Sequence, residues 1–327
     1  MRAPAFWYAS PGFTSSVLAP LAALYAAGTA RRLKRQGYRP SVPVVCVGNL
    51  SVGGTGKTPT VMDLVQRLAA MGKRPQILSR GYGGRLQGPV QVDPARHTAD
   101  DVGDEPLLLA AFAPVWVAKD RAAGAQAAEA AGADIIVMDD GFQNPEVAKD
   151  AGLVVVDAAR GFGNGRVIPA GPLREPIGAG LARASGLVLI GDEAVRAAFR
   201  AVHGERLGNL PVHEAVLQPL PTGMPWQGLR AFAFAGIGHP ERFFQTLKAL
   251  GADVVASRAL DDHQPLTNAL AGRLLSEARA LAARPVTTEK DAVRLPQSLR
   301  SEVLTLPVRL QWADAAPVDA ALNALFP

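Results

Sequence analysis

The sequence contains almost no cysteine, since Cys46 is the only one among its 327 residues. A single thiol cannot form a disulfide within the chain, and it cannot build a zinc site from thiolates. Internal repeats, low-complexity segments and a long Lys/Arg tail are also missing, so nothing indicates a nucleic-acid-binding arm. The hydrophobic content of 48% supports the core of one large soluble domain or two smaller ones. The 34 lysines and arginines outnumber the 29 acids, which favours anionic partners such as nucleotides or an acidic membrane surface.

Charged residues are absent from the beginning of the chain. None occurs from Ala3 to Ala30, and the next stretch is the basic cluster "RRLKRQ" at residues 31–36. The aromatic triplet "FWY" at residues 6–8 has the amphipathic chemistry of a membrane interface. A signal peptide ending at Ala30 is one alternative.

The same segment has the pattern of a helix with one apolar face. That face contains Leu18, Leu21, Ala22 and Tyr25. Pro20 and the many Ala, Ser and Thr residues argue against a membrane span. We expect residues 1–36 to form a helix that lies on an anionic membrane; a helix packed on the protein's own core is the alternative.

From residue 37 onward, short apolar runs alternate with helical patterns, as in a parallel sheet with right-handed crossovers. The predicted strands are "VPVVCVG" (42–48), "PQILS" (75–79), "PVWVA" (114–118), "ADIIVMDDG" (133–141), "LVVVDA" (153–158) and "GLVLIGD" (186–192). Four prolines then interrupt this alternation in residues 209–228. We predict a main α/β domain at 37–209, a linker at 210–228 with at most one strand, and a smaller α/β domain at 229–327. The run "VLTLPVRL" (303–310) is expected to be the last strand of the smaller domain.

A glycine-rich turn follows the first predicted strand and precedes a helix, which is the context of a nucleotide phosphate loop. In "VGNLSVGGTGKTP", Ser51 replaces the first glycine of the common G-x-x-x-x-G-K-[ST] pattern, but "GGTGKT" matches the variant GGxGK[ST]. We expect Lys57 to reach the β- and γ-phosphates of ATP, and the hydroxyl of Thr58 to bind Mg²⁺. The predicted loop consists of Ser51, Val52, Gly53, Gly54, Thr55, Gly56, Lys57 and Thr58. A nucleotide site argues against export of the chain, and therefore against the signal peptide.

Two further acidic motifs accompany the loop. "IIVMDDG" places Asp139 and Asp140 where a central strand ends, beside the loop, as magnesium ligands. "DDVGDEP" places Asp104 and Glu105 at the start of a helix predicted for residues 103–112. Acids at these positions also occur as surface pairs and helix caps. The functional alternative is a base for a substrate hydroxyl at Asp104 and a further metal ligand at Glu105.

"DDHQP" contains His263 among acids in the second predicted domain, where it is either structural or a proton relay. Two segments rich in glycine carry arginines suited to bidentate phosphate contacts. They are "SRGYGG", with Arg80 and Tyr82, and "ARGFGNGRVIPAGPLREP" (159–176), with Arg174 and Glu175. Either segment is alternatively a solvated surface loop.

Taken in order, the motifs resemble those of the tetraacyldisaccharide 4′-kinase family, from about residue 7 to residue 311. They are "VGNLSVGGTGKTP", "ILSRGYGG", "VGDEPLLLA", "DDGFQ", "RGFGNGRVIPAGPLREP", "FAGIGHPERFF" and "TTEKDAVR". The resemblance implies a phosphate-loop NTPase-type sheet and an ATP- and Mg²⁺-dependent kinase. Its substrate would be the 4′-hydroxyl of a tetraacylated glucosamine disaccharide 1-phosphate, and its product lipid IVA.

The resemblance also assigns roles to single residues. It implies that Asp104 and His263 are catalytic together with Lys57. The substrate residues that we expect are Arg80, Tyr82, Gln143, Asn144, Arg174 and Glu175. Asn144 replaces a histidine of the family pattern DDGxQH; asparagine keeps a hydrogen-bonding side chain but cannot titrate. Gln264 replaces the second histidine of the family's DHH motif.

The expected location is the cytoplasmic face of the inner membrane, as a peripheral or monotopic protein. We expect a lipid substrate and a membrane surface as partners, without nucleic acid or an obligate protein partner. One competing hypothesis is a phosphate-loop switch ATPase acting through a protein partner, but Val52 replaces the second lysine of that branch, and no guanine-reading segment occurs. A membrane adaptor without enzymatic activity is the other hypothesis, and the intact Lys57, Thr58, Asp139 and Asp104 argue against it.

Overall fold

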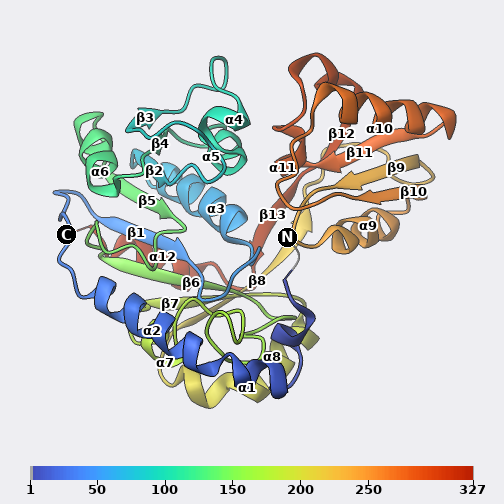
Figure 1. Cartoon of the computed structure of the whole chain (residues 1–327). Coiled ribbons are helices and arrows are strands. Elements are labelled where there is room, and N and C mark those ends of the chain that lie inside the picture. The colour runs from blue at the N-terminus through green and yellow to red at the C-terminus, as the bar shows by residue number, and fades with distance from the viewer. Residues whose placement is uncertain (1–2, 327) are drawn as a thin grey trace.

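The computed structural model describes residues 3–326, which form two α/β units of unequal size (Figure 1). The larger unit is built on a nine-stranded sheet, and the smaller unit on a four-stranded sheet. The predicted α/β class with a dominant parallel sheet is confirmed.

The nine strands of the larger sheet pair in parallel except at its two edges. Their order across the sheet is β13 (Val308–Trp312), β8 (Val212–Pro219), β7 (Gly186–Ile190), β6 (Ala151–Asp157), β1 (Val44–Gly48), β5 (Ile135–Asp139), β2 (Pro75–Ser79), β4 (Val115–Val117) and β3 (Val90–Gln91). Only β13 and β3 are antiparallel to their neighbours.

Helices cover both faces of this sheet, which explains why its central strands are apolar throughout. One face packs against α3 (Lys57–Ala70), α5 (Asp104–Leu109) and α12 (Ala316–Asn323). The other face packs against α2 (Ala19–Leu33), α6 (Arg121–Ala130), α7 (Ile177–Leu181) and α8 (Glu193–Leu207). In β1, Val45 and Val47 face the first set of helices, whereas Val44 and Cys46 face the second. Each such buried side chain contributes about 1.5–3 kcal/mol.

The smaller unit repeats this arrangement with parallel strands only. Its strands are β10 (Asp253–Ala259), β9 (Arg230–Ala235), β11 (Arg284–Thr288) and β12 (Leu304–Leu306), and its helices are α9 (Pro240–Ala249), α10 (Asn268–Ala280), α11 (Glu289–Ala292) and the 3₁₀ turn η2 (Gln297–Glu302). Along β9 the alanines at 231, 233 and 235 pack toward α9, whereas Phe232 and Phe234 pack toward α10.

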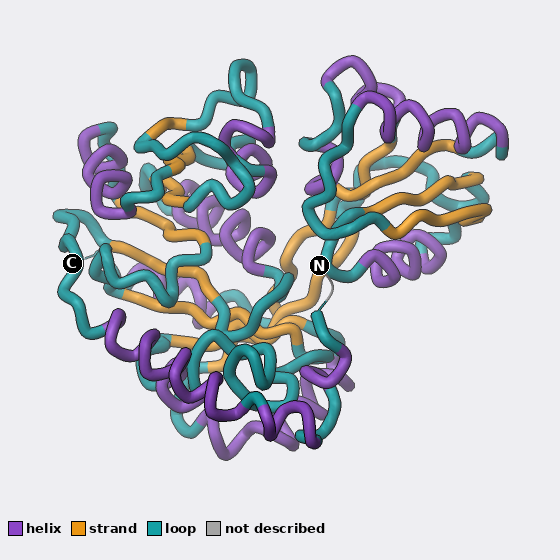
Figure 2. The backbone as a smooth tube through the Cα atoms, in the orientation of Figure 1, coloured by secondary structure: helices purple, strands orange, loops and turns teal. Residues whose placement is uncertain are grey.

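The division of the chain differs from the predicted one at two places. The segment expected to be a linker contains β8, which is a strand of the larger sheet. Residues 303–310 do not form one strand, because Pro307 separates β12 in the smaller sheet from β13 in the larger. β13 and α12 therefore belong to the larger unit, where Trp312 is buried and its indole donates to Asp63 Oδ2 at 2.6 Å. Figure 2 shows β8 and β13 side by side where the two units meet.

The N-terminal segment forms η1 (Ala5–Tyr8), α1 (Phe13–Val17) and α2. Pro20 lies in the first turn of α2, where proline is well tolerated, so it does not interrupt the helix. The face predicted from the sequence is divided: Ala22 is buried against the sheet, whereas Leu21 and Tyr25 are exposed. Across residues 3–326, no helix has the length and apolar character needed to cross a membrane.

α4 (Ala99–Val102) precedes α5 in place of the single helix predicted for residues 103–112. Gly103 separates the two with a φ of 90°, a left-handed conformation that glycine adopts readily. A Cβ at this position would lie 2.6 Å from the carbonyl oxygen of Tyr82. The break makes Asp104 the first residue of α5.

Candidate active site

A groove of about 1110 Å³ is lined by side chains of both units. The larger unit contributes the ends of its parallel strands, where α/β proteins usually bind ligands. The smaller unit contributes residues around the starts of α9 and α11 and the loop that follows β10.

The predicted phosphate loop connects β1 to α3 and lies in this groove. Gly56 has a φ of 97°, and a Cβ there would approach Ile190 Cδ1 to 2.5 Å, so the position requires glycine. Residues 52–58 line the groove. Ser51 is buried behind the loop, and the N–H of Val52 donates to the carbonyl of Pro172 at 2.8 Å, so these two residues fix the loop's beginning. Asn49, which the sequence interpretation omitted, donates to Thr55 Oγ1 and to the carbonyl of Gly53, each at 3.3 Å.

Asp139 ends β5 next to the loop, as predicted, and its side chain is 2% exposed. Ser79 donates to its Oδ2 at 3.3 Å, whereas its Oδ1 has no hydrogen-bond partner within residues 3–326. Burial raises the pKa of Asp139 to about 7, and the neighbouring carboxylates of Glu105 and Asp140 add to this effect.

This unsatisfied oxygen is suited to a cation. Thr58 Oγ1 donates to Glu105 Oε1 at 3.5 Å, so a hydroxyl and two carboxylates face the same space. In the described part of the chain, no group of three His, Cys, Asp or Glu side chains could hold a metal by itself. Proteins commonly hold Mg²⁺ with one or two carboxylates together with nucleotide phosphates and water.

We predict that Asp139→Asn stabilises the metal-free protein at pH 8 but not at pH 4. The folded protein holds the Asp139 proton up to about pH 7, whereas the unfolded chain releases it near pH 4. The contribution of this group to stability is therefore present below pH 4 and is lost as the pH rises to about 7. Thermal unfolding in EDTA should show the two proteins diverging by a few degrees across this range. Parallel melting profiles would contradict the assigned pKa.

Unlike Asp139, Asp140 has positively charged partners. Arg174 donates to both of its oxygens, at 2.8 and 3.1 Å, and Lys57 Nζ lies 3.8 Å from Oδ1. Burial alone would raise the pKa of Asp140, but the charges of Lys57 and Arg174 lower it. Asp140 thus holds two cations, Lys57 of the phosphate loop and Arg174.

Asp104 and His263 come from different units and are in contact: His263 lines the groove, and Asp104 is buried next to it. His263 Nδ1 lies 3.0 Å from Asp104 Oδ2, and Asp104 is 4% exposed. On its other side, His263 Nε2 lies 3.2 Å from the Nζ atom of Lys290. Burial would lower the pKa of Lys290, but the carboxylates of Glu105, Asp104 and Asp262 raise it, so it remains an ammonium.

This contact determines the state of the histidine. An ammonium can only donate, so His263 Nε2 is the acceptor and its Nδ1 carries the proton that is donated to Asp104. Burial alone would raise the pKa of Asp104, but the His263 hydrogen bond and the charges of Lys290 and Arg294 lower it. Asp104 is therefore an ionised, oriented carboxylate that can accept a proton.

The other predicted substrate residues do not all face the groove. Arg80, Tyr82, Arg174, Gln143 and Asn144 line it. The ring of Tyr82 contacts the ring of His263 edge-on at 5.6 Å. Glu175 is buried outside the groove, where it accepts from Arg183 at 2.7 and 2.9 Å and from Gln143 at 2.9 Å.

Asn144 makes a local contact, because its Oδ1 accepts from the N–H of Glu146 at 2.9 Å. This bond stabilises the turn after β5, which is a common use of asparagine. It gives the side chain a structural role that needs no titrating group.

Sequence reasoning missed three cations at the site. Lys290 and Arg294 lie in "TTEKDAVR", whose match to the family motif was the only signal available. Arg294 Nε is 3.6 Å from Asp104 Oδ2, and Lys290 Nζ is 3.1 Å from Glu105 Oε1, so α11 and the residues just after it bring two positive charges to this pair of acids. Arg121, which begins α6, is 2% exposed, and burial lowers its pKa to about 10 beside Asp139.

A phosphate loop, a magnesium-compatible acid pair and an oriented carboxylate on one groove define a phosphate-loop phosphotransferase. The family model described as tetraacyldisaccharide-1-P 4′-kinase matches residues 14–327. The chain therefore belongs to the tetraacyldisaccharide-1-P 4′-kinase family, and the resemblance of its motifs is confirmed.

Individual relatives agree with this. The tetraacyldisaccharide 4′-kinase of Dinoroseobacter shibae is 62% identical over 100% of this chain and 98% of its own length. The enzyme of the same name from Jannaschia sp. is 56% identical over 100% and 99%. The crystal structure of LpxK from Aquifex aeolicus in complex with ATP superposes with a TM-score of 0.77 at 26% identity, covering 96% of this chain and 100% of that one.

Proposed function

We propose that the protein transfers the γ-phosphate of ATP to the 4′-hydroxyl of tetraacyldisaccharide 1-phosphate, giving lipid IVA in lipid A biosynthesis. The observation that carries the proposal is the buried Asp104 carboxylate, which is held by His263 of the other unit, a residue that lines the same groove as the phosphate loop. That arrangement supplies a base for an alcohol acceptor next to the place where a nucleotide's phosphates bind.

Each residue of the site has a role in direct, in-line transfer. Lys57 and Arg174 neutralise charge on the transferring group, and Asp140 holds these two cations in place. Thr58, Asp139 and Glu105 would hold a magnesium ion, which when bound would offset the charge of the β- and γ-phosphates. Asp104 accepts the hydroxyl proton, and His263 orients it. Closure of the smaller unit excludes water as a competing acceptor.

Transfer of ³²P from γ-labelled ATP to tetraacyldisaccharide 1-phosphate in detergent micelles with Mg²⁺ tests this function. Labelled lipid is the expected product. Rapid ATP hydrolysis that is independent of lipid, without labelled lipid, would instead support a switch ATPase.

The location we propose is the cytoplasmic face of the inner membrane, with α1 and α2 lying on the bilayer surface. Their outer side exposes large apolar residues, including Phe13 at 86% and Leu24 at 70%. The basic residues of positions 31–35 follow directly, and each adds about 1 kcal/mol of attraction to anionic lipid. Binding at the surface would avoid extracting a multiply acylated substrate into water, which costs about 0.8 kcal/mol per exposed CH₂.

We predict that the double substitution Leu21→Gln and Leu24→Gln lowers the affinity for anionic vesicles by at least about tenfold, because two exposed leucines are lost from the contact. Cosedimentation with phosphatidylglycerol vesicles measures it. Leu220→Gln, at an exposed leucine outside α1 and α2, is the matched control. Equal binding of all three proteins would exclude this face as the contact.

A further inference from the structure

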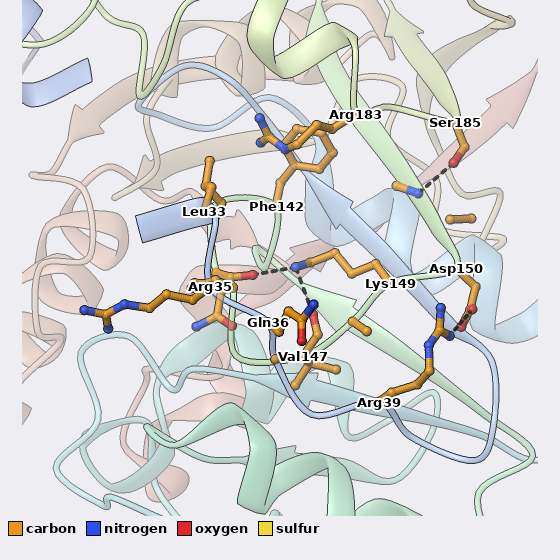
Figure 3. Close-up of a pocket in the computed structure, with 16 residues that line it drawn as sticks. Leu33, Arg35, Gln36, Arg39, Phe142, Val147, Lys149, Asp150, Arg183 and Ser185 are labelled. Atoms are coloured by element: carbon orange, nitrogen blue, oxygen red, sulfur yellow. Dashed lines mark hydrogen bonds and ion pairs between the residues drawn. The ribbon is translucent and has the colours of Figure 1, made fainter. Parts of the chain in front are cut away.

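A second cavity, of about 600 Å³, lies beside the groove and shares Arg35, Gln36, Asn144 and Pro145 with its lining. Figure 3 shows its lining, which comes from the end of α2 and residues 35–39, from the β5–β6 loop, and from residues 183–185 after α7. The phosphate loop, Asp104 and the smaller unit contribute nothing to it. None of the residues with a role in the proposed kinase reaction lines this cavity.

The lining is strongly basic, with four cationic side chains against one acid. Arg39 is 2.8 Å from that acid, Asp150, and Arg183 binds both oxygens of Glu175. These two arginines are therefore compensated. Lys149 and Arg35 have no carboxylate within 4.0 Å among residues 3–326, so the cavity keeps an uncompensated positive charge.

Lys149 is the more informative of the two. Its ammonium donates to the carbonyls of Asn144 and Val147, which leaves one N–H free. Burial lowers the pKa of Lys149, and the charge of Arg183 lowers it further. A partly buried ammonium with only neutral partners is costly, and an anion in the cavity would offset that cost.

The cavity also offers neutral donors. The hydroxyl of Ser185 accepts from the N–H of Gly152 at 3.1 Å, so its own proton is free to donate. Gln36 also lines the cavity, and its side-chain amide is a further neutral donor. The ammonium of Lys149 together with these neutral donors is suited to binding the oxygens of a phosphate ester.

We propose that this cavity binds the phosphate of an anionic phospholipid headgroup. Its volume falls in the usual range for small-molecule sites. Leu33, the last residue of α2, and Arg35 lie on its lining, so the cavity adjoins the end of the helix whose outer face is exposed and apolar. The choice of a lipid rather than a soluble phosphate rests on the proposed membrane contact of α2.

Calorimetric titration with monomeric dihexanoyl phosphatidylglycerol tests the cavity without a bilayer. We expect saturable binding that Lys149→Met weakens by about tenfold, since one charge-assisted bond is lost. Arg35→Gln should weaken it several-fold, and because this side chain is exposed and makes no polar contact within the described residues, the variant will fold even if Lys149→Met does not. Arg31→Gln removes the same charge from α2 outside the cavity and is the matched control.

Three results would overturn the proposal. The first is that the wild type does not bind the lipid. The second is that Lys149→Met and Arg35→Gln both bind it as tightly as the wild type does. The third is that the wild type binds glycerol 3-phosphate as tightly as the lipid. The last result would assign the cavity to a soluble phosphate. If the wild type produces labelled lipid but does not bind phosphatidylglycerol, the kinase function stands and only the proposal for the cavity is rejected. Vesicle binding tests the membrane contact of α2 separately.

Discussion

Replacing Asp104 by asparagine is expected to lower kcat by at least about 100-fold, with little change in affinity for ATP. Asparagine keeps the size of the side chain and can accept hydrogen bonds, but it cannot take the proton of the 4′-hydroxyl. The nucleotide contacts of the phosphate loop do not involve Asp104, so binding should be spared. Single-turnover transfer of ³²P to lipid and separate titration with ATP measure the two effects.

Asp100→Asn is the control for this substitution, because Asp100 is an exposed acid four residues away on α4. It should retain full activity. If Asp104→Asn kept more than about a tenth of the wild-type rate, Asp104 would not be the base.

Lys290→Met should lower kcat by about 30- to 100-fold, although Lys290 touches neither the phosphate loop nor Asp104 directly. The ammonium donates to Glu105 Oε1 at 3.1 Å and to His263 Nε2. Without it, His263 is free to carry its proton on Nε2 and to present a lone pair to Asp104, which repels the carboxylate. An incorrect histidine tautomer is known to be costly in catalysis.

The measurements for Lys290→Met are kcat and the ¹⁵N chemical shifts of the His263 ring, which report the tautomer. Lys290→Arg should recover part of the rate, because it restores a donor. Lys248→Gln, at an exposed lysine on α9, controls for a charge change in the same unit. A loss of activity with an unchanged His263 spectrum would mean that Lys290 acts on Glu105 or on folding and not through the histidine.

The parts of the site that could be predicted from the sequence are those encoded by neighbouring residues. The strand "VVCVG", the glycine turn and Lys57 follow one another in the chain, and Asp139 directly ends an apolar strand. Buried parallel strands end at one edge of a sheet, so these groups had to lie together. The residues alone left Asp104 and His263 with structural alternatives, and only the motif resemblance assigned them a joint catalytic role, because 159 residues separate them.

The remainder depends on how distant segments pack, which local patterns do not encode. Lys290 reaches Glu105 across 185 residues. Glu175 was expected to face the substrate, but Arg183, eight residues further along the chain, neutralises it in the interior. β13 has the composition of any short strand, and its place beside β8 follows from burial of Leu310 and Trp312 against α3 and not from its own sequence.

The strand pair β8–β13 has a consequence for the architecture of the chain. The two strands are antiparallel neighbours, and the N–H of Leu220 donates to the carbonyl of Pro307 at 2.9 Å. Everything between these residues, including the whole four-stranded sheet, is therefore an insertion into a β-hairpin of the larger unit. Excising residues 221–306 and closing the hairpin with a short turn should leave a nine-stranded protein that keeps its phosphate loop but lacks the histidine partner of Asp104.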